Sequence, residues 1–156
     1  MTGPLVFVAP GAHVTETVHM QEESSVWFGA VVRGNVTLEE RVNVQDNSIV
    51  EGAFDQPTVI GAGTSLGHNA RVSGAIVEPR SLIAIGATVL PGAHVGSESI
   101  VAANATVPEG MRVPPRSLVI GRGRILRQVT DAEIERIERG ARDYARLTRE
   151  YSTATR

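Results

Sequence analysis

The chain has 156 residues, no cysteine and a formal net charge of −2. The lack of cysteine excludes disulfides, thiolate metal sites and cysteine nucleophiles, and the small charge argues against a nucleic acid or an acidic membrane as partner. No apolar run approaches the roughly 18 residues that a membrane span needs, and no leader peptide is recognisable. We therefore expect a soluble, cytoplasmic protein.

An aliphatic residue recurs at every sixth position from the N-terminus to residue 120. A helix has period 3.6 and a simple strand period 2, so period six indicates short strands separated by tight turns. Small residues follow each aliphatic one at a fixed spacing, which suits bends. The aliphatic positions are Val8, Val14, Met20, Val26, Val32, Leu38, Val44, Val50, Ile60, Leu66, Val72, Val77, Ile83, Val89, Val95, Val101, Val107, Val113 and Val119.

Three such repeats form one triangular coil of about eighteen residues, so the pattern predicts a parallel β-helix of about six coils. A β-sandwich of short strands is the alternative, but it would not keep a period of six over some hundred residues. The register is interrupted at residues 52–58 and slips by one residue after Val72. We expect 52–58 to be a loop outside the coil, serving either function or simple insertion.

The pattern changes after Val119. Residues 121–124 (Gly-Arg-Gly-Arg) are expected to leave the coil as a solvated turn, in preference to a phosphate site. Thr130-Asp-Ala-Glu133 is a capping box that opens a helix of about twenty residues. Its apolar face comprises Ile134, Ile137, Ala141, Tyr144, Leu147 and Tyr151. We predict one domain, with a β-helix over 1–120 and an exit segment plus helix over 121–156, the helix packing on its own coil or on a neighbour's.

Polar side chains interrupt the aliphatic pattern in three short segments. They are Arg33-Gly34-Asn35, Asn43-Val44-Gln45-Asp46 and Gly67-His68. In these segments, and over nearly its whole length, the chain resembles the γ-class carbonic anhydrase-like family. The resemblance implies a left-handed β-helix, a homotrimer, and three histidines that hold zinc or a related ion where two subunits meet.

Carried over by position, the three metal-ligand sites fall on Glu51, His68 and Ser73, so only one histidine is present. A neutral serine hydroxyl is a poor zinc donor, and a catalytic zinc usually has three protein ligands and an open position for water. Glu51 and His68 are residual candidates that would bind zinc weakly, and without zinc no bound water has its pKa lowered to about 7. We expect no metal, no other cofactor and no carbonic anhydrase activity.

Asn35 stands where the family has an aspartate, which removes the carboxylate expected beside Arg33. The remaining histidines, His13, His19 and His94, end their six-residue repeats and are expected to face solvent.

These residues suggest a metal-independent lyase, hydrolase or cyclase that acts on a small carbonyl-containing substrate. Glu51 and His68 from adjacent subunits would form an acid–base pair, in which the carboxylate raises the pKa of the imidazole. The predicted catalytic residues are Glu51, His68, Ser73 and Tyr144. The predicted substrate-binding residues are Arg33, Asn35, Gln45 and Asp46.

Other interpretations stay open. Arg33, Gln45 and Asp46 could instead form a structural network between subunits, and Ser73 could be only a small corner residue. The whole protein could be a non-catalytic scaffold trimer or a residual metalloenzyme. A hexapeptide-repeat acyltransferase is less favoured, because the loop at 52–58 contains no histidine.

Overall fold

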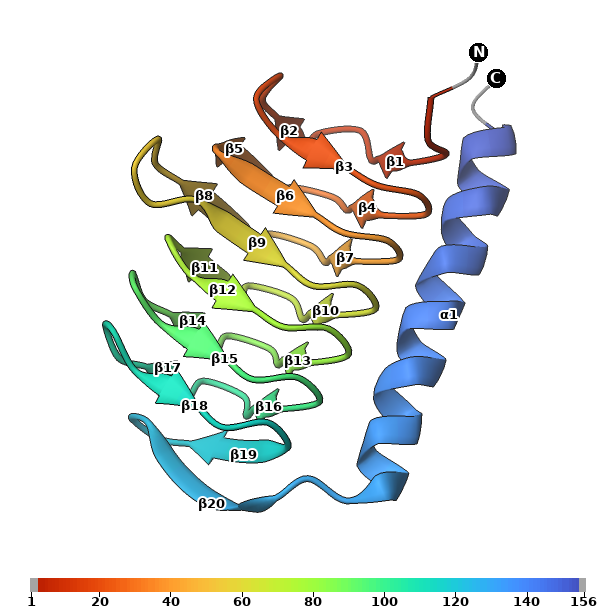
Figure 1. The fold of residues 1–156 in the computed structure, drawn as a ribbon. Coiled ribbons are helices and arrows are strands. Elements are labelled where there is room, and N and C mark those ends of the chain that lie inside the picture. The colour runs from red at the N-terminus through yellow and green to blue at the C-terminus, as the bar shows by residue number, and fades with distance from the viewer. Residues whose placement is uncertain (1–2, 155–156) are drawn as a thin grey trace.

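The computed structural model describes residues 3–154 as a triangular β-solenoid with one long helix along its side (Figure 1). Up to residue 120, consecutive short strands belong to different sheets, and strands one coil apart pair in parallel. This is the predicted left-handed parallel β-helix of about six coils.

Three sheets form the sides of the triangle. Sheet A contains β1 (Phe7–Val8), β4 (Ser25–Val26), β7 (Asn43–Val44), β10 (Ser65–Leu66), β13 (Leu82–Ile83), β16 (Ile100–Val101), β19 (Ser117–Ile120) and β20 (Arg124–Gln128). Sheet B contains β2 (His13–Val14), β5 (Val31–Gly34), β8 (Ile49–Gly52), β11 (Arg71–Ser73), β14 (Thr88–Val89) and β17 (Thr106–Val107). Sheet C contains β3 (His19–Met20), β6 (Val36–Leu38), β9 (Thr58–Ile60), β12 (Ile76–Val77), β15 (His94–Val95) and β18 (Arg112–Val113).

The turns between sheets form three corners. We name them the AB, BC and CA corners, after the sheets that each turn leaves and enters. Because the strands of successive coils pair in register, equivalent corner residues stack into columns along the axis. The corners therefore repeat each side-chain position once per coil.

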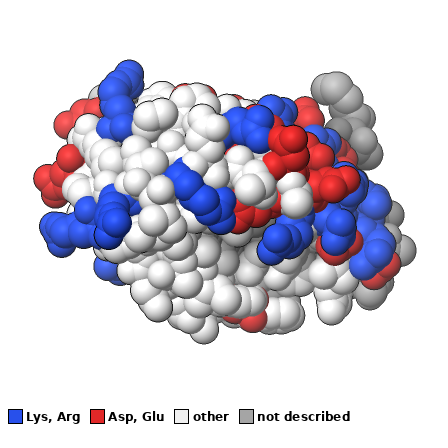
Figure 2. Space-filling model, turned by 90° about the horizontal axis from the view of Figure 1, so that it is seen from below, with Lys and Arg blue, Asp and Glu red and all other residues white. Residues whose placement is uncertain are grey.

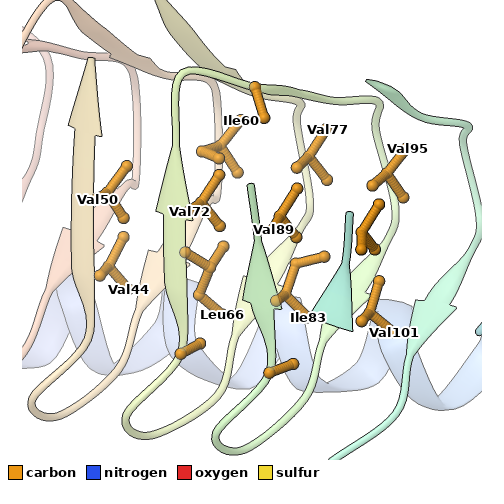
Figure 3. Packing of buried hydrophobic residues seen from close by; sticks show 14 of the residues in the cluster. Val44, Val50, Ile60, Leu66, Val72, Val77, Ile83, Val89, Val95 and Val101 are labelled. Atoms are coloured by element: carbon orange, nitrogen blue, oxygen red, sulfur yellow. The ribbon is translucent and has the colours of Figure 1, made fainter. Parts of the chain in front are cut away.

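The interior is a stack of aliphatic side chains (Figure 3). Val44 pairs with Leu66 and Leu66 with Ile83 across neighbouring coils, and all three are fully buried. Burying each such side chain stabilises the fold by about 1.5–3 kcal/mol. The aliphatic positions of the six-residue pattern therefore identify the core residues.

The first coil departs from that pattern. Val8 was expected in the interior but is 41% exposed, and Val14 and Met20 are only half-buried. An interior side chain is covered by the coils on both sides of it, and the first coil has a neighbour on one side only. The prediction of a buried Val8 is wrong for this reason.

The C-terminal end of the solenoid is closed by β20, a strand that the sequence did not reveal. Residues 121–124 turn the chain back so that β20 pairs antiparallel with β19 at the edge of sheet A. All five of its residues are exposed, so it has no buried face and produces no apolar alternation. The segment expected to be only an exit turn therefore also extends a sheet.

The helix α1 (Asp131–Ala154) begins at the predicted capping box and has 24 residues. The Glu133 amide donates to Thr130 Oγ1 (3.2 Å), and the Thr130 amide donates to Glu133 Oε1 (2.9 Å). The helix lies along sheet A of its own chain, where Tyr144 meets Trp27 edge-on with ring centroids 5.4 Å apart. No helix within residues 3–154 has the length and apolar character of a membrane span.

Candidate active site

A column of three polar side chains stands at the end of sheet B, where the chain enters the BC corner. Arg33, Glu51 and Ser73 occupy equivalent positions in three successive coils. Arg33 donates from Nε (3.0 Å) and Nη2 (2.6 Å) to Glu51 Oε2, and Ser73 Oγ donates to Glu51 Oε1 (3.0 Å). Both carboxylate oxygens of Glu51 thus accept hydrogen bonds within one chain.

The environment of Glu51 favours its ionised form. The hydrogen bond from Arg33 holds the pKa of Glu51 below its ordinary value, against the opposing effect of partial burial. The hydrogen bond from Ser73 and the positive charges of Arg33 and Arg71 lower this pKa further. Glu51 is therefore a carboxylate at neutral pH.

Two glycines allow the coils to close on each other at this corner. Gly34 has φ +81°, and a Cβ there would lie 2.0 Å from the carbonyl oxygen of Gly52. A Cβ at Gly52 would lie 2.1 Å from the carbonyl oxygen of Asn35. Only glycine fits such contacts, so these positions support the column from the backbone side.

A cavity of about 390 Å³ opens beside this column. Its lining includes Arg33, Glu51 and Ser73 together with Ala53 and Gln56 from the loop between β8 and β9. Gln56 reaches over Gly74, where an added Cβ would lie 3.1 Å from its side chain. The sequence predicted the loop but did not single out Gln56 as a residue of the site. The break in the repeat was the signal that could have drawn attention to it. Phe54, at the tip, is 96% exposed.

The AB corner, at the opposite end of sheet B, carries a different column. Phe28, Asp46, His68 and Ile85 occupy equivalent positions, because the carbonyl of each accepts a hydrogen bond from the next coil. Phe28 is 46% and Ile85 54% exposed, whereas Asp46 and His68 between them are half-buried. The His68 side chain has no hydrogen bond or ion pair among residues 3–154.

Gln45 and Tyr144 lie on this side of the molecule as well. Gln45 Nε2 donates to Asn43 Oδ1 (3.0 Å), and Gln45 and Tyr144 line a cavity of about 230 Å³ between sheet A and α1. Burial raises the pKa of Tyr144, and the nearby charge of Asp46 adds to this effect. Tyr144 therefore lies near Asp46, which follows Gln45 in the chain.

The predicted site residues thus divide into two groups within one chain. Arg33, Glu51 and Ser73 come together, and the exposed Asn35 follows them at the BC corner. The structure does not bring His68 to Glu51 in the same chain, since β11 runs from the AB corner to the BC corner between His68 and Ser73.

Two expectations about individual residues need correction. Asn35 was expected to leave Arg33 without a carboxylate partner. Arg33 instead forms an ion pair with Glu51. His94 is not simply solvated, because its Nε2 contacts Glu78 Oε2. His13 and His19 are exposed as expected.

The donors at the BC corner do not match those of a zinc site. Both oxygens of Glu51 are engaged, one of them by a guanidinium that repels a cation, and Ser73 offers only a neutral hydroxyl. Among residues 3–154 of one chain, no three His, Asp or Glu side chains are placed to hold a metal ion.

Comparison with known proteins finds relatives over most of the chain. The chain is 42% identical over 142 residues to a carbonic anhydrase from Geobacillus kaustophilus, covering 88% of this chain and 78% of that protein. It is 38% identical over 156 residues to γ carbonic anhydrase 1 of Arabidopsis thaliana mitochondria, covering 94% of this chain and 57% of the relative. The chain thus spans little more than half of the Arabidopsis protein.

Solved structures support the same fold. A candidate acetyltransferase from Bacillus cereus superposes with a TM-score of 0.92 at 27% identity, over 96% of this chain and 90% of that one. No protein-family model matches the chain. The three parallel sheets and the six-residue repeat define a hexapeptide-repeat β-helix protein. The chain belongs to the γ-class carbonic anhydrase family.

Proposed function

We propose that the protein is a homotrimeric enzyme that acts without a metal ion on a small carbonyl-containing substrate. Its site would combine Arg33, Glu51 and Ser73 of one subunit with His68 of an adjacent subunit. The observation that carries this proposal is the hydrogen-bonded Glu51 carboxylate, held by Arg33 and Ser73 beside a cavity of about 390 Å³. The family resemblance places two metal-ligand positions at Glu51 and Ser73.

The AB corner supports a contact between subunits. Phe28 and Ile85 are large, exposed apolar side chains on either side of Asp46 and His68. Exposed aromatic side chains such as Phe28 are enriched at protein interfaces. A second copy whose BC corner met this column would bring Glu51 to His68.

The roles of the residues follow from their chemistry. Glu51, with its lowered pKa, remains an anion that orients and stabilises a protonated His68. The imidazole of His68 accepts a proton from water or substrate and returns it to the leaving group. Arg33 presents a guanidinium at the cavity wall, which suits a carbonyl or carboxylate oxygen. Such a site suits a lyase, hydrolase or cyclase.

A metal-dependent carbonic anhydrase is disfavoured by the donor set. Zinc would compete with Arg33 for Glu51 and would find only a hydroxyl at Ser73. Metal analysis of untagged protein tests this point, and stoichiometric zinc, iron or cobalt in the trimer would contradict the proposal.

The central experiment compares turnover by the wild type with that of Glu51→Gln and His68→Asn. Activated esters, small carboxylated substrates and acetyl-CoA serve as probes, with light scattering to establish the oligomer. Both variants should lose turnover while the trimer stays intact. The controls are Glu135→Gln and His19→Asn, which change exposed residues elsewhere.

Unchanged turnover in Glu51→Gln or His68→Asn would refute the acid–base pair. A non-catalytic scaffold would instead show no turnover with any probe and a stable protein partner whose binding both variants retain.

A further inference from the structure

The CA corner carries a ladder of charged residues that the proposed site does not use. One residue per coil adopts a left-handed conformation with φ between +57° and +71°. The ladder consists of Glu23, Arg41, Gly63, Arg80, Glu98 and Arg116. Every member except Gly63 is charged, so glycine leaves a gap in a row of long side chains.

The helix α1 runs beside this corner and neutralises the two ends of the ladder. Arg116 Nη2 donates to Asp131 Oδ1 (2.6 Å) where the helix begins. Arg149 forms an ion pair with Glu23 near the other end. Figure 2 shows the resulting mixture of acidic and basic side chains on the side of the molecule that carries α1.

Among the described residues, the middle of the ladder forms no ion pair with α1. A cavity of about 420 Å³ opens around Gly63, and its lining includes Arg41, Arg80, Arg142 and Arg149 but only two carboxylates, Glu23 and Glu138. Arg149 is paired with Glu23, whereas the carboxylates nearest to Arg41 and Arg80, those of Glu40 and Glu98, lie outside the lining.

In three of these arginines, the guanidinium N–H groups form no hydrogen bond with a described carboxylate. The nearest carboxylate oxygens lie 3.9 Å from Arg41 (Glu40) and 3.7 Å from Arg80 (Glu98), beyond hydrogen-bond distance. The side chain of Arg142 has no hydrogen bond or ion pair among residues 3–154.

We propose that this cavity binds the phosphate group of a small anionic molecule. Guanidinium groups match the oxygens of a phosphate through paired, charge-assisted hydrogen bonds. Three arginines with available donors around one gap provide such a set, and the cavity has room for more than the phosphate alone. This site lies at the CA corner, so it is separate from the proposed acid–base site.

The test is titration of the intact protein with inorganic phosphate at constant ionic strength, followed by calorimetry and by NMR of the Gly63 amide. We expect saturable binding that chloride does not reproduce, with a shift of the Gly63 signal. Arg142→Gln should raise the phosphate Kd about tenfold, the loss that corresponds to about 1.4 kcal/mol for one charge-assisted hydrogen bond. Arg139→Gln, an exposed helix residue outside the cavity lining, is the matched control.

Glycerol 3-phosphate forms the second arm of the experiment. Tighter binding than inorganic phosphate supports an organic phosphate ligand, and equal or weaker binding supports free phosphate. Absence of saturable binding by both probes would overturn the proposal, as would an Arg142→Gln affinity equal to that of the wild type.

Discussion

The two corners that flank sheet B carry acidic and basic side chains but arrange them differently. At the BC corner, each carboxylate oxygen of Glu51 accepts a hydrogen bond from its own chain, from Arg33 or from Ser73. At the AB corner, His68 has no side-chain partner among residues 3–154 and stands in a column with the exposed Phe28 and Ile85. The BC corner pairs its charged groups within the chain, and the AB corner leaves two large apolar side chains exposed beside Asp46 and His68.

The cause of this difference is geometric. Parallel coils stack at about 4.8 Å, so residues of one corner meet their equivalents in the next coil. Residues of different corners are separated by a strand and cannot approach each other within the chain. A site that needs both corners of this solenoid therefore requires a second copy.

The largest expected effect is on turnover, when two inactive variants are mixed in one trimer. Glu51→Gln and His68→Asn should each be inactive alone. If each site takes Glu51 and His68 from different chains, random mixing in equal amounts should restore about a quarter of the wild-type sites. Turnover after denaturation and co-refolding of the two variants measures this. Absence of recovery, with trimers present, would contradict a shared site.

Gly34→Ala should damage the BC corner selectively. A Cβ there would lie 2.0 Å from a backbone oxygen, at φ +81°. We expect the free energy of unfolding to fall by about 3 kcal/mol or more, since both strain and a backbone clash contribute. Gly11→Ala is the control, because Gly11 has φ +82° but open space around it. It should cost only about 1 kcal/mol, and equal losses in urea denaturation would contradict the close approach.

Arg33→Gln should raise the pKa of Glu51 toward its ordinary value. The lowered pKa of Glu51 gives a stabilisation that is present above the ordinary value of 4.5 and lost as pH falls through the lowered value. The variant should therefore be less stable at neutral pH, by under about 1 kcal/mol because the pair is partly exposed, and equal to the wild type in strong acid.

Carbon NMR of the Glu51 carboxyl across the acid range measures this pKa. Arg127→Gln is a matched comparison, because Arg127 is the main cause that lowers the pKa of Glu133 to about 2. An unchanged Glu51 pKa in Arg33→Gln would show that the ion pair does not persist in solution.

Tyr144→Phe should have the smallest effect. The ring keeps its contact with Trp27, so the free energy of unfolding should change by less than about 0.5 kcal/mol. If the hydroxyl assists chemistry near Asp46 and His68, turnover should fall by less than about tenfold. Steady-state kinetics and Trp27 fluorescence separate these effects, and unchanged kinetics would remove Tyr144 from the predicted site.

The architecture could be predicted from the sequence because the same six-residue pattern repeats along the coil. An aliphatic residue at every sixth position could only be buried by a coil of that period, and the capping box at Thr130 and Glu133 marked the start of the helix. The exceptions have local causes. Val8 lacks a covering coil, and β20 has no buried face to leave a pattern.

The candidate site could be predicted from the sequence only in part. The sequence singled out Glu51, His68 and Ser73 through the family resemblance, but not the pairing of Glu51 with Arg33 or the position of Gln56 in the cavity wall. Contacts between coils join residues about eighteen positions apart. Arg33 and Glu51 keep this spacing, so the repeat could have suggested their pairing, but the break at 52–58 changes the spacing between Glu51 and Ser73. Partners on the two sides of the break cannot be read without the register.

By itself, the sequence determined the coil, its core and the terminal helix, since burial of an aliphatic side chain at every sixth residue requires a coil, while the left hand of that coil came from the family resemblance. The tertiary structure alone decided which polar groups meet. It paired Glu51 with Arg33 and Ser73, left His68 at the opposite corner, and gathered arginines around Gly63. Those outcomes depend on how successive coils stack, because side chains at a corner find their partners in neighbouring coils and not along the chain.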